Sequence, residues 1–123
     1  MTLNDYQKEA MTTCTKSSEN FSYMMLNLVG EIGELSGKVA KLLRKQQFVI
    51  NNNEFEVRNG SLAYDETSQL YEERKKEAGD CLWQLSGLCY VMGWKLEDVA
   101  KQNLEKLASR KQRGVIVGEG DNR

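Results

Sequence analysis

Residues 28–43, LVGEIGELSGKVAKLL, carry the hydrophobic pattern that decides the fold. Their apolar residues recur alternately four and three positions apart, which is the spacing of one face of an α-helix. These positions are Leu28, Ile32, Leu35, Val39 and Leu42. Because such a seam has to pack against another apolar surface, the stretch predicts a long helix over residues 19–46 with its seam buried against a second helix.

Three more helices are predicted around this one, over residues 3–15, 67–92 and 96–111. Thr2 and Asp5 resemble a capping box that opens the first, Ser17 or Ser18 can cap the helix over 19–46, and Gly93 ends the third. Apolar seams continue along the last two helices: Ala78, Cys81, Leu85, Leu88 and Met92, then Leu96, Val99, Leu104 and Leu107.

The segment at about 46–66 breaks the helical pattern. Short β-rich runs flank Asn-rich and Asn-Gly turn signals there, so the segment is an irregular insertion for which a hairpin is one alternative. The predicted fold class is all-α, an antiparallel four-helix bundle-like domain with this insertion between its second and third helices. We expect a single domain over residues 1–123, with a glycine-rich tail over about 114–123.

The composition excludes several classes of chemistry. The chain has no histidine, which excludes a Ser-His-Asp triad and the His-containing di-iron sites of helix bundles. Its three cysteines form no CxxC pair and are expected to be reduced thiols. A net charge of −1 gives no global field for nucleic acid or an anionic membrane. No apolar run reaches the ~18 residues that span a bilayer and no signal-peptide pattern opens the chain, so we expect a cytoplasmic protein.

Two pairs of acidic residues flank the predicted seams. On an ideal helix Glu31 and Glu34 lie about 60° apart at the edge of their seam, and Glu77 and Asp80 repeat this arrangement. Either pair alone is typical of a solvated helix face. If the two helices pack seam to seam, however, four carboxylates converge and repel one another unless a divalent cation neutralises them. All-oxygen ligands suit Mg²⁺ or Mn²⁺.

The last predicted helix carries a basic face. Asn103, Lys106, Arg110 and Arg113 recur three, four and three residues apart. Cations beside a carboxylate-bound metal ion are the components that hold a polyphosphate, and Lys38, in the sector of the first acidic pair, is a further substrate-binding candidate. A basic face is also expected on ordinary grounds, because the helix dipole favours cations at a helix C-terminus.

Three glycines of the helix over 19–46 and three aromatic residues of the chain can each be interpreted in two ways. Gly30, Gly33 and Gly37 share a third sector of the same helix, which indicates close approach of another element such as a second subunit, although single glycines are also tolerated. Tyr6, Phe21 and Trp83 are available to stack on a base, but aromatic residues at helical spacing more often belong to the core.

These residues resemble the signature of the MazG-like, all-α nucleotide pyrophosphohydrolases. The likeness lies in EIGE at 31–34, EAGD at 77–80, the opening LNDYQKEA at 3–10 and the end NLEKLASRKQRGVIVGEGDNR at 103–123. It covers nearly the whole chain except about 46–66. Forty-two residues separate Glu34 from Glu77, a longer connection than most small members have.

The resemblance implies Mg²⁺-dependent hydrolysis of a nucleoside triphosphate to the monophosphate and pyrophosphate. It implies metal-binding and catalytic roles for Glu31, Glu34, Glu77 and Asp80, and substrate contacts for Asn103 and Lys106. Arg110 and Arg113 are weaker phosphate-binding candidates, and the tail is expected to close over the nucleotide. The resemblance also implies a homo-oligomer, a dimer or a tetramer.

Two alternatives to this interpretation stay open from the sequence. One is a related enzyme on the same scaffold that hydrolyses dUTP, dCTP or phosphoribosyl-ATP. The other is a non-catalytic helical oligomerisation or adaptor module.

Overall fold

Over residues 1–120, which the structure describes, the computed structural model contains helices and one small antiparallel sheet. In chain order the elements are α1 (Leu3–Met11), α2 (Phe21–Arg44), β1 (Phe48–Asn51), β2 (Glu54–Val57), α3 (Tyr64–Val91) and α4 (Leu96–Gln112). The predicted all-α class is confirmed, and the insertion is a hairpin.

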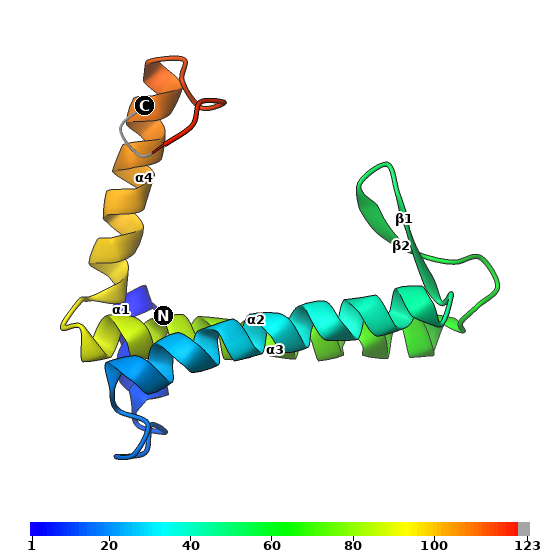
Figure 1. The fold of residues 1–123 in the computed structure, drawn as a ribbon, viewed down its shortest axis with the longest axis horizontal. Helices are drawn as coiled ribbons and strands as arrows, with labels where there is room; N and C mark the ends of the chain where they lie inside the picture. Colours follow the sequence, from blue (N-terminus) through cyan, green and yellow to red (C-terminus); the bar gives the residue numbers. More distant parts are fainter. Residues whose placement is uncertain (121–123) are drawn as a thin grey trace.

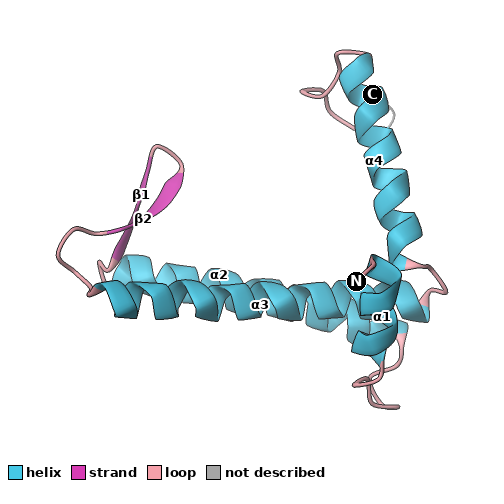
Figure 2. Ribbon diagram, turned by 180° about the vertical axis from the view of Figure 1, so that it is seen from behind, coloured by secondary structure: helices cyan, strands magenta, loops and turns pink. Residues whose placement is uncertain are grey.

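The two long helices α2 and α3 lie side by side and antiparallel, and they position everything else (Figure 1). The hairpin stands at one end of this pair. At the other end α1 packs on α3, and α4 begins there and rises away from the pair on the same side as the hairpin (Figure 2). Beyond its base, which contacts α1 and the end of α3, α4 extends alone.

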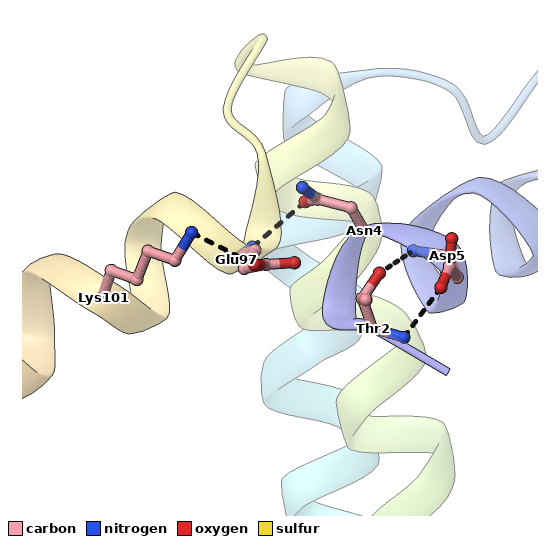
Figure 3. Close-up of polar contacts among 5 residues, drawn as sticks. All are labelled: Thr2, Asn4, Asp5, Glu97 and Lys101. Carbon is pink, nitrogen blue, oxygen red and sulfur yellow. Dashed lines mark hydrogen bonds and ion pairs between the residues drawn. The ribbon is translucent and has the colours of Figure 1, made fainter.

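Local capping explains where the helices begin and end. The predicted box is present: the Asp5 amide donates to Thr2 Oγ1 at 3.0 Å, and the Thr2 amide donates to the Asp5 carboxylate at 2.8 Å (Figure 3). The prediction that Ser17 or Ser18 caps α2 is wrong, because Asn20 accepts the bond from the Tyr23 amide at 2.9 Å. Ser18 Oγ donates instead to the Thr15 carbonyl at 2.9 Å.

The hairpin is held onto the helix pair by one buried aromatic residue. Phe48 is 1% exposed, stacks on Phe55 with ring centroids 4.3 Å apart, and meets the edge of Tyr71 at 5.8 Å. The strands are joined by Asn52 and Asn53, whose positive φ angles of 49° and 66° suit a tight hairpin turn. Asparagine tolerates this left-handed conformation better than most residues do.

The buried apolar core within one chain is small. Its members are Met24, Leu42, Phe48, Cys89 and Leu96. Gly87 leaves room for Met24 where α3 meets α2: a Cβ atom there would lie 2.4 Å from Sδ of the fully buried Met24, so the end of that side chain would have to shift. Near Gly87 the two helices therefore approach closely.

Several residues of the predicted seams are exposed, which corrects the sequence analysis. Ile32 is 53% exposed and Leu104 is 65% exposed. Both predictions failed for the same reason. Periodicity identifies an apolar side of a helix, but α4 leaves the pair, and within residues 1–120 no other element covers these sides. Among residues 1–120, no helix is long and apolar enough to cross a membrane.

Candidate metal and nucleotide site

Three of the four predicted carboxylates meet between α2 and α3. Glu31 and Glu34 of α2 and Glu77 of α3 each place one carboxylate oxygen within 4.8 Å of the others. We call these three residues the acidic cluster. They come together because the helices are antiparallel and Glu77 is set opposite the first acidic pair. Asp80 lies outside this group, about one helical turn after Glu77.

A lysine is bound to the acidic cluster. Lys38 Nζ forms an ion pair with Glu77, whose side chain is only 12% exposed. The hydrogen bond to Glu77 raises the pKa of the Lys38 ammonium, and the negative charges of Glu34 and Glu73 act in the same direction. Lys38 was predicted to contact substrate; in the structure it neutralises part of the cluster's charge.

Neighbouring groups also feel the carboxylates. Burial, and then the charges of Glu31 and Asp80, raise the pKa of the Cys81 thiol. Burial and Asp80 likewise raise the pKa of Tyr6 on α1. Asp80 therefore extends the negative potential of the cluster toward α1, and both neighbours favour their protonated, neutral forms.

Two polar residues near the cluster were not identified as site residues from the sequence. Asn27 donates from Nδ2 to Glu31 Oε1 at 3.1 Å, which orients that carboxylate. Arg74, one turn before Glu77, has buried Nε and Nη1 atoms without a hydrogen-bond partner among the described residues. The sequence did contain a signal that Arg74 faces the neighbouring helix, because Arg74 lies four positions before Ala78 and continues the predicted seam.

The glycines of α2 form an open face beside the cluster. No described atom outside the helix backbone lies within 4 Å of a Cβ built at Gly33 or Gly37. These glycines line a shallow hollow together with Glu34, Lys38 and Lys41. The close approach that the glycines predict does not occur within the described part of one chain.

The predicted basic face divides into two parts. Asn103 and Lys106 lie on the exposed side of α4 and line a hollow with Val99 and Gln102. Arg110 is instead 6% exposed, and its Nη2 donates to the Gly120 carbonyl at 3.5 Å, so it holds the described part of the tail, residues 114–120, against the helix.

Two of the remaining candidate residues, Arg113 and Trp83, make hydrogen bonds to nearby residues. Arg113 donates from Nε to Ser109 Oγ at 3.3 Å. Trp83 donates from Nε1 to the Ala10 carbonyl at 3.1 Å and to Thr13 Oγ1 at 3.0 Å, which fastens α3 to the end of α1. Phe21 is 50% exposed.

The acidic cluster and the basic helix lie apart within one chain. By the rise of an α-helix, Glu77 lies about 20 Å before the end of α3, and Lys106 about 15 Å beyond the start of α4. Because α4 rises away from the pair (Figure 1), it carries its cations away from the acidic cluster of the same chain.

Comparison with known proteins places this geometry in a family. The model of the MazG nucleotide pyrophosphohydrolase domain matches residues 19–115, a range that includes the acidic cluster, Asp80 and the basic face of α4. The chain belongs to this family.

One relative of this MazG chain is the "Gene 37 protein" of Mycobacterium phage L5. The two are 38% identical over 107 residues, which cover 87% of this chain and 80% of the phage protein. No solved structure matches the chain.

Proposed function

We propose that this member of the MazG family hydrolyses a nucleoside triphosphate to the monophosphate and pyrophosphate, with Mg²⁺ as the required ion. The acidic cluster is the observation that carries the proposal. Three carboxylates with oxygens within 4.8 Å of one another are unfavourable unless positive charge joins them, and among residues 1–120 only Lys38 forms an ion pair with the cluster.

The donor atoms fit a hard divalent cation. Glu31, Glu34 and Glu77 supply oxygen only, as Mg²⁺ and Mn²⁺ prefer, and Asp80 is available one turn further along α3. When bound, such an ion neutralises phosphate charge and lowers the pKa of a water molecule. Asn27 holds the Glu31 carboxylate in place, and Lys38 can exchange its bond to Glu77 for one to a phosphate oxygen.

The basic face of α4 supplies the groups that bind the leaving phosphates. Lys106, with Asn103 beside it, is suited to bind the phosphates that leave as pyrophosphate. Arg110 contributes by keeping the tail folded against α4 rather than by its own exposure. Mg²⁺ as the ion, the nucleotide bound and a cytoplasmic location stay predictions.

A substrate panel tests the activity. We expect purified protein with Mg²⁺ to release pyrophosphate from at least one standard or modified nucleoside triphosphate, and chelation of the ion to abolish release. Including dUTP, dCTP and phosphoribosyl-ATP separates the related enzymes from one another. Release of orthophosphate alone would contradict hydrolysis at the α-phosphorus.

The active form is a homo-oligomer in which a second copy supplies α4. Apolar side chains on α2, α3 and α4 are exposed in one chain, including Ile32, Leu85 and Leu107 at 53%, 41% and 44%. A second copy covers them and also brings complementary charge, because the basic face of its α4 meets the acidic cluster. Each site is then shared between two chains.

Mixing two inactive variants tests this arrangement. We expect Glu77→Gln and Lys106→Ala to be inactive or weakly active alone, and their mixture, after co-refolding, to recover about a quarter of the parent activity. Half of randomly mixed dimers are heterodimers, and each heterodimer has one intact site.

The control mixture pairs Glu77→Gln with Glu31→Gln, which impair the same part of the site and are expected not to complement. If the first mixture shows no more activity than the control mixture, each site is built from a single chain.

A further inference from the structure

The start of α4 is bonded to α1 through one buried glutamine. Gln7 is 8% exposed, and its amide makes three hydrogen bonds across the junction between α3 and α4. Nε2 donates to the Ser86 carbonyl at 3.3 Å and to the Trp94 carbonyl at 3.0 Å, while Oε1 accepts from the Leu96 amide at 3.1 Å. One side chain therefore joins the end of α3, the connection and the first turn of α4.

These bonds replace a cap that α4 lacks. The first amides of any helix have no partner within the helix, and the residue before α4, Lys95, offers no side-chain acceptor. Gln7 satisfies the Leu96 amide, and Asn4 accepts from the Glu97 amide at 3.3 Å (Figure 3). Both acceptors come from α1, so the capping of α4 also fixes its position relative to α1.

Within the described part of one chain, α4 is held near its base by these bonds and by Leu96, which is 5% exposed. Gly93, at a φ of 71°, turns the chain after α3, and beyond its base α4 makes no extensive contact with the helix pair. A rotation at this base would therefore move every residue further along α4. The placement of Asn103 and Lys106 depends on the bonds that Gln7 and Asn4 make.

We propose that Gln7 is a positioning residue: it does not contact the nucleotide, but sets where α4 presents Asn103 and Lys106 to the polyphosphate. The inference rests on the proposed function for the role of these two residues. It also goes beyond the family match, since α1 lies before residue 19.

Gln7→Met tests the proposal, because methionine fills a similar volume but can neither donate to the two carbonyls nor accept from the Leu96 amide. We expect hydrogen exchange at Leu96 to accelerate at least about tenfold, and the affinity for tripolyphosphate with Mg²⁺ to fall about tenfold. KM for the best nucleotide should rise by a similar factor, with kcat changed less. Mn²⁺ affinity, which reports on the acidic cluster alone, should stay within about twofold.

Thr13→Val is the matched control. Thr13 Oγ1 is one of the two acceptors of the Trp83 indole N–H, and it lies near the end of α1 that is far from α4, so the substitution leaves the contacts of α4 unchanged. It is expected to leave tripolyphosphate affinity and KM unchanged. Asn4→Ala removes only the bond to Glu97 and should reproduce the Gln7→Met pattern at about threefold, even if the Gln7 variant does not fold.

Two results would overturn the proposal. One is fast exchange at Leu96 with tripolyphosphate affinity equal to that of the control. The other is a loss of Mn²⁺ affinity as large as the loss of tripolyphosphate affinity, which indicates general destabilisation. If the parent protein releases no pyrophosphate but the tripolyphosphate shift occurs, the proposed reaction fails while the positioning role of Gln7 stands.

Discussion

Glu77→Gln is expected to lower kcat for pyrophosphate release by about 10³-fold while the protein keeps its fold. Glutamine preserves the shape of the side chain but removes the charge that a metal ion requires. Glu77 is the member of the acidic cluster that comes from α3, and its side chain is only 12% exposed. Without it, Glu31 and Glu34 face the substrate from one helix only. Asp80→Asn tests the fourth predicted ligand in the same way, although Asp80 lies outside the cluster.

Pyrophosphate release and Mn²⁺ binding should be measured together for these variants. Glu72→Gln is the matched control, because Glu72 is also on α3 but its side chain is 65% exposed and forms an ion pair with Lys75 at 3.6 Å, away from the acidic cluster. It should behave like the parent. Mg²⁺ should raise the unfolding temperature of the parent and the control, but not that of Glu77→Gln. Unchanged turnover in both Glu77→Gln and Asp80→Asn would contradict the assignment of the metal site. No turnover in the parent, together with an unfolding temperature that Mg²⁺ does not change, would favour a non-catalytic oligomerisation module.

Phe48→Ala should reduce the free energy of unfolding by about 3 to 5 kcal/mol. The side chain is almost completely buried between Phe55 and Tyr71, so truncation leaves a cavity at the point where the hairpin joins the helix pair. Tyr71 also donates from its hydroxyl to the Phe55 carbonyl at 3.3 Å, a bond that the displaced hairpin would lose. Urea unfolding followed by circular dichroism measures the change.

Ile50→Ala is the comparison for Phe48→Ala, because Ile50 lies on the same strand but is 59% exposed. Its effect is expected to stay below about 0.5 kcal/mol. Equal effects of the two substitutions would show that Phe48 is not what anchors the hairpin. A loss at Phe48 confined to hydrogen exchange in the hairpin, with no change in global unfolding, would show that the hairpin unfolds separately from the helices.

The elements of this fold were predictable from the sequence because their signals are local. The seam from Leu28 to Leu42, the Thr2–Asp5 box and Gly93 each act within a few turns of helix. The hairpin was only one alternative, since its turn uses Asn52 and Asn53 rather than an unambiguous Asn-Gly pair.

Unlike the antiparallel packing of α2 and α3, the placement of α4 was not predictable, because it depends on contacts between distant residues. The direction of α4 follows from bonds between Gln7 and the Leu96 amide, which no periodicity reveals. For the same reason the exposure of Ile32 and Leu104 was missed.

In the candidate site, too, what depends on local helical spacing was predictable and what depends on contacts between distant residues was not. Helical spacing predicted that four carboxylates converge, and Glu31, Glu34 and Glu77 do meet, because seam-to-seam packing of two helices fixes which edges come together, while Asp80 lies outside the group. It did not predict the ion pair of Lys38 with Glu77, which depends on the axial offset between the helices. Nor did it predict that Arg110 lies under the tail, which requires the chain to turn back at Gly114, where φ is 70°.

A helix attached only at its base acts as a lever. With 17 residues at about 1.5 Å each, α4 is about 25 Å long, so a rotation of about 10° at Gly93 displaces its far end by roughly 4 Å. That displacement exceeds the length of a hydrogen bond, about 3 Å, so it would break a contact with a phosphate oxygen. Small substitutions around the α3–α4 junction should therefore alter catalysis more than their distance from any carboxylate suggests.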